Sequence, residues 1–307
     1  MHVLLIGGNG FIGSHLKDFL PLNGVSVSVL DRFPERYRLS QNNVQVFLGD
    51  HTDLALTQRS MEGADALIYL ASTSVPLTSA SDPATDITTN LVPFLCYLDE
   101  ALRLKVKRVV FLSSGGTVYG IPISLPVTEE HPTQPLVSHG IVKLMMEKYL
   151  FALAYNHGME VVILRVGNAY GEGQNPFGRF GAIATFLGCF ARRLPITIWG
   201  NGEMIRDYVY VKDIASACLA ALNVKSSYSI YNIGTTRGYS LNDLIEIIAN
   251  VTNLSAPDIH REERHSYDVP HIVLDSTLAR QQLGWEPTTL LSGGLRVTWE
   301  WVQALSF

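Results

Sequence analysis

The sequence predicts an α/β fold in which a doubly wound parallel sheet is followed by a smaller C-terminal α+β region. Three observations support this prediction. Short uncharged apolar runs alternate with segments of helical periodicity as far as residue 166. A glycine-rich turn separates the first apolar run from the first helical segment, and after residue 167 the chain becomes rich in Gly, Asn and Gln. We therefore divide it into residues 1–166 and 167–307, with some later segments returning to the first part.

The glycine-rich turn organises the first part. It follows a predicted buried strand at residues 2–6 and opens a predicted helix at residues 11–20. Side chains at Gly7, Gly10 or Gly13 would block the tight turn, the approach of a pyrophosphate or the packing of helix on strand, and the helix N-terminus offers N–H donors to an anion. This arrangement predicts a Rossmann-like dinucleotide site, with an ordinary βα loop as the alternative.

An acid at the expected distance indicates which dinucleotide binds. The second predicted strand, residues 25–30, ends at Asp31, 18 residues beyond Gly13. An acid at about 20 residues hydrogen-bonds the adenosine ribose. A carboxylate there would repel a 2′-phosphate, so the predicted cofactor is NAD. Arg32 lies beside Asp31 and could pair with a 2′-phosphate, so the phosphorylated cofactor stays open as an alternative.

Further strands are predicted at residues 44–48, 64–70, 108–112 and 161–164. The carboxyl ends of parallel strands form a ligand crevice, which places Asp50 and His51 where an adenine could be read. Asp50 as a helix cap is the alternative. The small residues that follow the fourth strand, Ala71 and Ser72, leave room for a cofactor. We expect the sheet to be complete at Leu164 and the later segments to form a lid.

Hydroxyl groups follow the fifth strand, and an imidazole and an ammonium follow them. The run from Ser113 to Gly120 suits a sugar or nicotinamide site, with a polar loop as the alternative. Ser138 is predicted to cap a helix in which His139 and Lys143, four residues apart, share one face. Such pairs are more often solvated surface, but the position after the hydroxyl loop favours a site.

Composition limits the partners. An apolar content of 47% is ample for a large core. A net charge of −5 gives no basic field for nucleic acid or an anionic membrane. No uncharged apolar run approaches the roughly 20 residues of a bilayer span and no signal precedes the first strand, so we expect a cytoplasmic protein. Cys96, Cys189 and Cys218 predict reduced thiols rather than disulfides or a metal site.

With these residues in place, the chain resembles the extended short-chain dehydrogenase/reductase family, and within it the nucleotide-sugar epimerases of the UDP-galactose 4-epimerase type. The resemblance covers nearly the whole chain. It rests on Gly7-x-x-Gly10-Phe11-Ile12-Gly13, Asp31, Asp50, the Ser113 to Gly120 block, Asn168, the run that begins Arg206-Asp207-Tyr208, and Leu283-Gly284-Trp285.

The resemblance implies NAD-dependent epimerisation at C4 of a UDP-hexose through a 4-keto intermediate, in a homodimer. It implies that His139 is the base, that Lys143 binds the ribose and lowers nearby pKa values, and that Thr117 and Ser114 assist. The implied cofactor-binding residues are Gly7, Gly10, Phe11, Ile12, Gly13, Asp31, Arg32, Asp50, His51, Leu70, Ala71, Ser72, Asn90, Lys143 and Gly167. The implied substrate-binding residues are Asn168, Trp199, Arg206 and Arg264.

Three positions depart from the family pattern. His139 replaces the tyrosine of Tyr-x-x-x-Lys, Gly115 stands where a Ser or Thr hydroxyl is usual, and His265 stands where an arginine is common. A histidine beside a positive charge should be neutral at pH 7 and able to accept a proton, although its ring reaches less far than a phenol. A 4-keto-sugar reductase and a non-catalytic protein that binds a nucleotide sugar or NAD are the alternatives. Gly116-Thr117 disfavours a dehydratase, which carries an acidic pair there.

Overall fold

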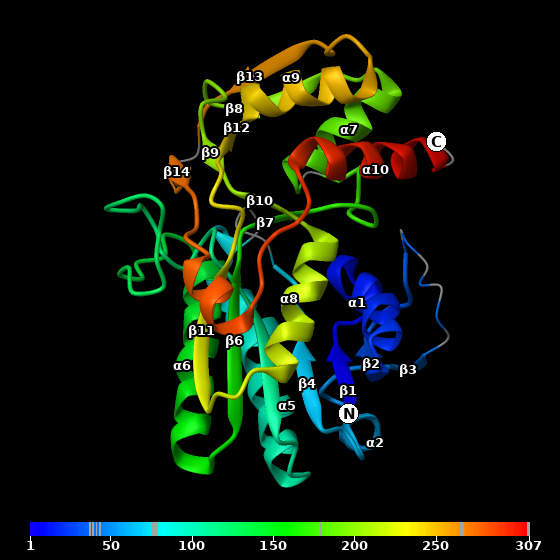
Figure 1. Cartoon of the computed structure of the whole chain (residues 1–307), viewed down its shortest axis with the longest axis vertical. Helices are drawn as coiled ribbons and strands as arrows, with labels where there is room; N and C mark the ends of the chain where they lie inside the picture. The colour runs from blue at the N-terminus through cyan, green and yellow to red at the C-terminus, as the bar shows by residue number, and fades with distance from the viewer. Residues whose placement is uncertain are drawn as a thin grey trace.

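The computed structural model describes residues 1–36, 38, 40, 42, 44–74, 79–178, 180–264 and 267–305. One sheet of seven parallel strands occupies its lower half (Figure 1). From edge to edge the strands are β3 (Gln45–Leu48), β2 (Ser26–Asp31), β1 (His2–Ile6), β4 (Ala66–Tyr69), β5 (Arg108–Ser114), β6 (Glu160–Val166) and β11 (Tyr228–Ile233). The strand order reverses between β1 and β4, which opens a crevice at the carboxyl ends. The predicted Rossmann-like, doubly wound fold is confirmed.

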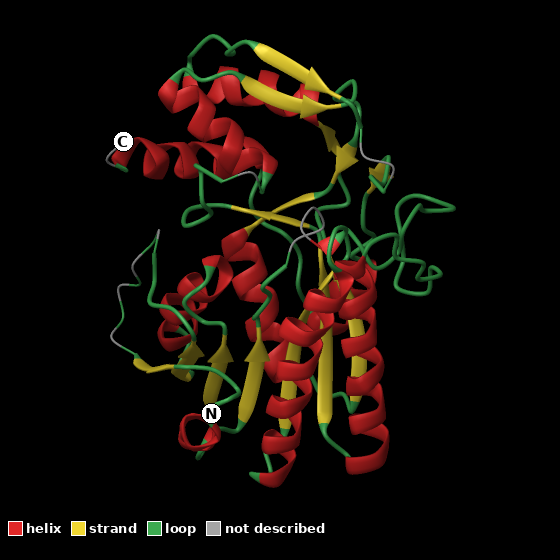
Figure 2. Cartoon of the chain, turned by 180° about the vertical axis from the view of Figure 1, so that it is seen from behind, coloured by secondary structure: helices red, strands yellow, loops and turns green. Residues whose placement is uncertain are grey.

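Helices cover both faces of the sheet. On one face α1 (Phe11–Leu22) packs beside α8 (Val211–Asn223). On the other lie α2 (Leu54–Met61), α5 (Val92–Arg103) and α6 (Ser138–His157), of which the long ones stand in front of the strands in Figure 2. Apolar residues four apart, such as Leu16 and Leu20 in α1, are fully buried against the strands. Burial of each such side chain stabilises the fold by about 1.5–3 kcal/mol.

The helix over residues 83–103 has an irregular start. It begins as α4 (Pro83–Asp86), continues through a π-helical turn (Ile87–Leu91) and becomes α5 without a break. Asn90 lies in the π-helical turn, a feature often found at functional sites. In α6, Ser138 is the first helical residue and Val137 precedes it without a side-chain cap, so the predicted cap at Ser138 is wrong.

The expectation that the sheet is complete at Leu164 is wrong. β11 adds a seventh strand beside β6, in register from Tyr228 opposite Val161 to Ile233 opposite Val166. Polar residues hid this edge strand in the sequence. One of them, Asn232, is fully buried and accepts the Tyr119 hydroxyl at 2.6 Å.

A smaller α+β lobe lies above the carboxyl ends of the strands (Figure 1). Its core packs α7 (Ala182–Arg192), α9 (Leu241–Thr252) and α10 (Leu291–Ala304) against β8 (Ile196–Trp199), which pairs with β13 (Ile259–Glu262). Short pieces join the lobe to the sheet: β7 (Asn168–Tyr170), β9 (Ile205–Arg206), β10 (Tyr208–Tyr210), β12 (Tyr239–Ser240), β14 (His271–Ile272) and a π-helical turn (Ala279–Leu283).

Three helices, α2, α9 and α10, were not predicted from the sequence. For α9 a signal was present, because Ser240 and Asp243 form a reciprocal capping box at its start. Among the described residues no helix is long and apolar enough to cross a membrane. All three cysteines are free thiols.

Candidate active site

Two cavities meet at the glycine turn. The first, about 760 Å³, lies over the carboxyl ends of β1, β2 and β4, and the second, about 550 Å³, lies beside β5 and the start of α6. Both are lined by Gly7, Gly10, Phe11, Leu70 and Ser72. Each volume falls in the range of small-molecule and cofactor sites.

The glycine turn fits a dinucleotide pyrophosphate. Gly7 has φ +83°, and a Cβ on it would lie 2.7 Å from the Ala71 nitrogen, while a Cβ on Gly13 would lie 2.5 Å from Gly8. Packing within the protein therefore requires these two glycines. A Cβ on Gly10 would meet only the Gly7 carbonyl, at 3.4 Å, so the space beside it is open to a ligand. Helix α1 starts here with neither a side-chain cap nor an acid in its first turn, which leaves its N–H donors to an anion.

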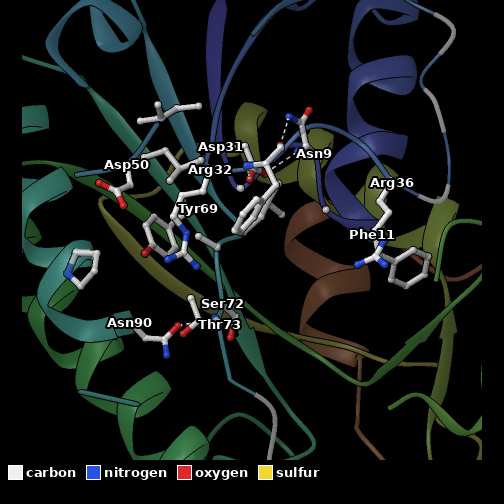
Figure 3. Close-up of a pocket in the computed structure, with 18 of the residues that line it drawn as sticks. Asn9, Phe11, Asp31, Arg32, Arg36, Asp50, Tyr69, Ser72, Thr73 and Asn90 are labelled. Atoms are coloured by element: carbon white, nitrogen blue, oxygen red, sulfur yellow. Dashed lines mark hydrogen bonds between the residues drawn. The ribbon is translucent and has the colours of Figure 1, made fainter. Parts of the chain in front are cut away.

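Two carboxylates, those of Asp31 and Asp50, line the first cavity (Figure 3). Asp31 accepts the N–H groups of Asn9 at 2.9 Å and Phe33 at 3.1 Å, which fixes its carboxylate at the end of β2. Asp50 accepts both the N–H and the hydroxyl of Thr52 on Oδ1, and these bonds lower the pKa of Asp50. The cap of α2 is Asp53, so the alternative reading of Asp50 as that cap is wrong.

The remaining residues expected to bind the cofactor also line the cavities. Arg32, His51, Ala71 and Asn90 line the first, and Ile12, Gly13, Lys143 and Gly167 line the second. Asn90 accepts the N–H of Thr73 at 2.8 Å and donates to Asp86 at 2.8 Å. It thereby ties the loop after β4 to the π-helical turn.

Ser114, Thr117, His139 and Lys143 meet in the second cavity. The Lys143 ammonium donates to the Leu112 carbonyl at 3.0 Å, and burial lowers the pKa of Lys143 to about 8. The Thr117 hydroxyl is buried and has no hydrogen-bond partner in the described part of the chain. Residues that carry an imidazole, an ammonium and an unpaired hydroxyl thus line one cavity.

His139 is neutral at pH 7. Burial, and then the charge of Lys143, lower its pKa to about 4, while the Asp86 carboxylate opposes them. The direction agrees with the sequence prediction. However, burial was not foreseen, and it makes the imidazole a weaker base than charge alone would.

The interpretation of Gly115 needs correction. A Cβ on Gly115 would lie 2.5 Å from the Leu274 side chain and 3.0 Å from the Arg165 carbonyl oxygen, so this position points away from the second cavity. The neighbouring hydroxyls of Ser114 and Thr117 belong to residues that line it. Tyr119, in the same run, is buried and hydrogen-bonds Asn232 and Arg165, which gives it a structural role.

The four residues expected to bind substrate separate into two groups. Asn168 and Arg206 line the second cavity. Burial lowers the pKa of Arg206, which donates to the Ile205 carbonyl at 2.9 Å. Trp199 and Arg264 are not among the described residues that line either cavity. Trp199 ends β8 in the upper lobe. The side chain of Arg264 is exposed and donates a hydrogen bond to the Asp268 carbonyl. His265 lies outside the described residues.

Two polar residues at the site were missed. The Ser74 hydroxyl lies 2.6 Å from Asp86 Oδ1 and 3.3 Å from His139 Nδ1. Asp86 is 2% exposed, and its Oδ2 has no hydrogen-bond partner in the described ranges. The spacing of Asp86 and Asn90, four apart on one helix, was a usable signal. No local signal links Ser74 to His139, 65 residues away.

Comparison with known sequences places the chain in a family of enzymes that act with NAD. The model of the NAD dependent epimerase/dehydratase family matches residues 3–234. UDP-glucose 4-epimerase of Azospirillum brasilense is 33% identical, over 99% of this chain and 92% of its own. The dTDP-4-dehydro-6-deoxyglucose reductase of Escherichia coli is 31% identical, over 95% of each chain.

Solved structures of UDP-glucose 4-epimerases superpose on this chain over nearly its whole length. UDP-glucose 4-epimerase from Thermotoga maritima, crystallised with UDP-glucose, superposes with a TM-score of 0.92 at 33% identity over 98% of both chains. The enzyme of the same name from Thermus thermophilus, in complex with NAD, superposes with a TM-score of 0.91 at 30% identity over 100% of both chains.

Proposed function

Because this chain belongs to the NAD dependent epimerase/dehydratase family, we propose that it inverts C4 of a nucleotide sugar, with UDP-hexoses as the substrate class. One observation carries the proposal. The glycine turn that fits a dinucleotide opens directly into a cavity lined by an imidazole, an ammonium and an unpaired hydroxyl. These groups suit proton removal from a sugar hydroxyl beside a nicotinamide.

The fit of NAD follows from the first cavity. Asp31 and Asp50 would hold the adenosine, and the N-terminus of α1 beside Gly10 would hold the pyrophosphate. When bound, NAD⁺ supplies a reversible hydride acceptor for C4.

The chain's own groups handle the proton and the charge. His139 takes the C4 hydroxyl proton and later returns it, after the 4-keto sugar has turned its other face. The ammonium of Lys143 stabilises negative charge that develops on the C4 oxygen. Thr117 and Ser114 donate hydrogen bonds to sugar oxygens, which would satisfy the buried Thr117 hydroxyl. Since burial weakens the base, we expect slow turnover.

Arg206 is the proposed clamp for the diphosphate. It lines the second cavity, and none of the ion pairs found among the described residues includes it. A guanidinium without a carboxylate partner offers its donors to phosphate oxygens.

The decisive experiment supplies the purified protein with UDP-glucose, UDP-galactose and their N-acetyl forms. We expect ¹H NMR to show C4 inversion towards the same equilibrium from either epimer, with His139→Gln as the inactive control. Retained epimerisation in that variant would remove His139 from the mechanism. Binding of NAD without turnover of any of these sugars would leave a non-catalytic binder as the better description.

A 4-keto-sugar reductase is the second candidate, favoured by the similarity to the Escherichia coli reductase. A reductase transfers hydride in one direction and consumes reduced cofactor, whereas an epimerase returns the hydride to the sugar and thereby regenerates the oxidised cofactor. Stoichiometric loss of NADH absorbance with a nucleotide 4-keto sugar would therefore establish the reductase.

We also propose that the protein is a cytoplasmic homodimer. Its free thiols suit a reducing compartment. Helix α6 exposes Ile141, Tyr149, Phe151 and Tyr155, which suit a subunit interface. Sedimentation velocity should give twice the chain mass, and Tyr155→Glu together with Phe151→Glu should give the single mass.

A further inference from the structure

A chain of polar groups joins His139 to a buried carboxylate. The Ser74 hydroxyl stands between them, 2.6 Å from Asp86 Oδ1 and 3.3 Å from His139 Nδ1. Asn90 flanks it, donating to the same Asp86 oxygen at 2.8 Å and towards the Ser74 oxygen at 3.4 Å. These contacts lie outside the roles assigned above.

The chemistry of the groups determines which of them donates and which accepts along the hydrogen bonds from Asp86 through Ser74 to His139. A hydroxyl has one proton, and an ionised carboxylate only accepts. The short contact therefore takes the Ser74 proton to Asp86, as in a charge-assisted hydrogen bond. The Ser74 oxygen then has only lone pairs left, so it can act only as a hydrogen-bond acceptor towards its other neighbours.

His139 Nδ1 is one of these neighbours, so this nitrogen must carry the proton that the Ser74 oxygen accepts. A neutral imidazole has one N–H, and the partner of one ring nitrogen decides where that proton sits. Nε2 is then the bare nitrogen, and no hydrogen bond to it is found among the described residues. The main chain of His139 is also anchored, since its backbone N–H donates to the Ser79 hydroxyl at 3.1 Å.

Asp86 has a second effect, through its charge. Among the described residues, Asp86 is the one acid whose charge raises the pKa of His139, and it opposes both the burial and the ammonium of Lys143. When His139 accepts a proton at Nε2, the Nδ1–H, Ser74 and Asp86 form a continuous path of hydrogen bonds from the imidazolium to the carboxylate. This arrangement stabilises the protonated ring.

We propose that Ser74 and Asp86 are positioning residues that hold His139 in the Nδ1–H tautomer, leaving Nε2 to accept the sugar proton. The inference rests on the proposed function for its catalytic meaning. Its structural content, the position of one proton, can be measured without any substrate.

The test is ¹⁵N NMR of the full chain labelled at histidine, with the His139 signals identified by their loss in His139→Gln. At pH 7 the parent protein should show a protonated Nδ1 and an unprotonated Nε2. In Ser74→Ala nothing holds the proton on Nδ1, so the ring should populate both tautomers. Ser74→Thr keeps the hydroxyl and should restore the parent signals. A protonated Nε2 in the parent protein would overturn the proposal.

Kinetics provide the second readout. Ser74→Ala and Asp86→Asn should lower kcat about tenfold or more, a part of the 10²–10⁴ that a general base contributes, with little change in KM. Exposed Asp82, the N-cap of the same helix, is the matched control, because Asn caps as well as Asp and Asp82→Asn removes the same charge. Equal losses in the Asp82 and Asp86 variants would also contradict the proposal. The expected tautomer with no epimerisation would instead refute the proposed function alone.

Discussion

The partial burial of His139, which keeps its imidazole neutral, predicts a specific dependence of stability on pH. Burial lowers the pKa of His139 to about 4 from its usual value of 6.5. The unfolded chain therefore binds a proton at this residue below pH 6.5, while the folded chain resists it until pH 4. Stability from this group is complete above pH 6.5 and is lost as the pH falls towards 4.

The magnitude follows from the shift. One pKa unit corresponds to about 1.4 kcal/mol, so a shift from 6.5 to about 4 corresponds to about 3 kcal/mol, of which about 2.5 is lost by pH 4.5. His139→Gln cannot titrate, and its free energy of unfolding should fall by about 2.5 kcal/mol less than that of the parent between pH 7 and 4.5.

Urea denaturation followed by circular dichroism at pH 7 and pH 4.5 measures this difference. Other groups, such as buried His15, contribute equally to both proteins and cancel. His260→Gln is the control, because His260 is exposed on β13, and it should behave as the parent does. If the parent and His139→Gln lose the same stability, the imidazole is not held neutral by burial and the reasoning is refuted.

Four further predictions concern the site and its support. Gly10→Val should abolish NAD binding in calorimetry but keep the circular dichroism spectrum, because its side chain would enter the open space at the turn. Arg206→Ala should raise KM for the nucleotide sugar about tenfold or more in steady-state assays, with a smaller effect on kcat. Glu147→Ala should lower the free energy of unfolding by about 3–5 kcal/mol in urea, because it leaves the Arg165 charge buried and unpaired. Gly115→Ser should lower the melting temperature without raising kcat, since the added atoms meet Leu274; a faster enzyme would contradict the corrected orientation.

The residues that line the proposed cofactor site could be gathered from the sequence. Gly7, Gly10, Gly13 and Asp31 belong to one strand–turn–helix–strand unit, in which the spacing along the chain sets the spacing in space. Every residue expected to bind the cofactor lines one of the two cavities.

The substrate half was predicted less completely. The cavity brings together His139, Lys143, Ser114 and Thr117, as the family pattern implied, but it does not include Trp199 or Arg264. The direction of a side chain in a loop depends on its backbone angles and its neighbours, which residue order does not reveal.

The sequence by itself determined six of the seven strands of the sheet, the glycine turn, the shared face of His139 and Lys143, and the acid at the end of β2, because periodicity and turn chemistry act over a few residues. Only the tertiary structure decided that β11 completes the sheet, that Gly115 faces Leu274 and that Ser74 joins His139 to Asp86. These contacts join segments far apart in the chain, and the packing of whole helices and strands brings them together.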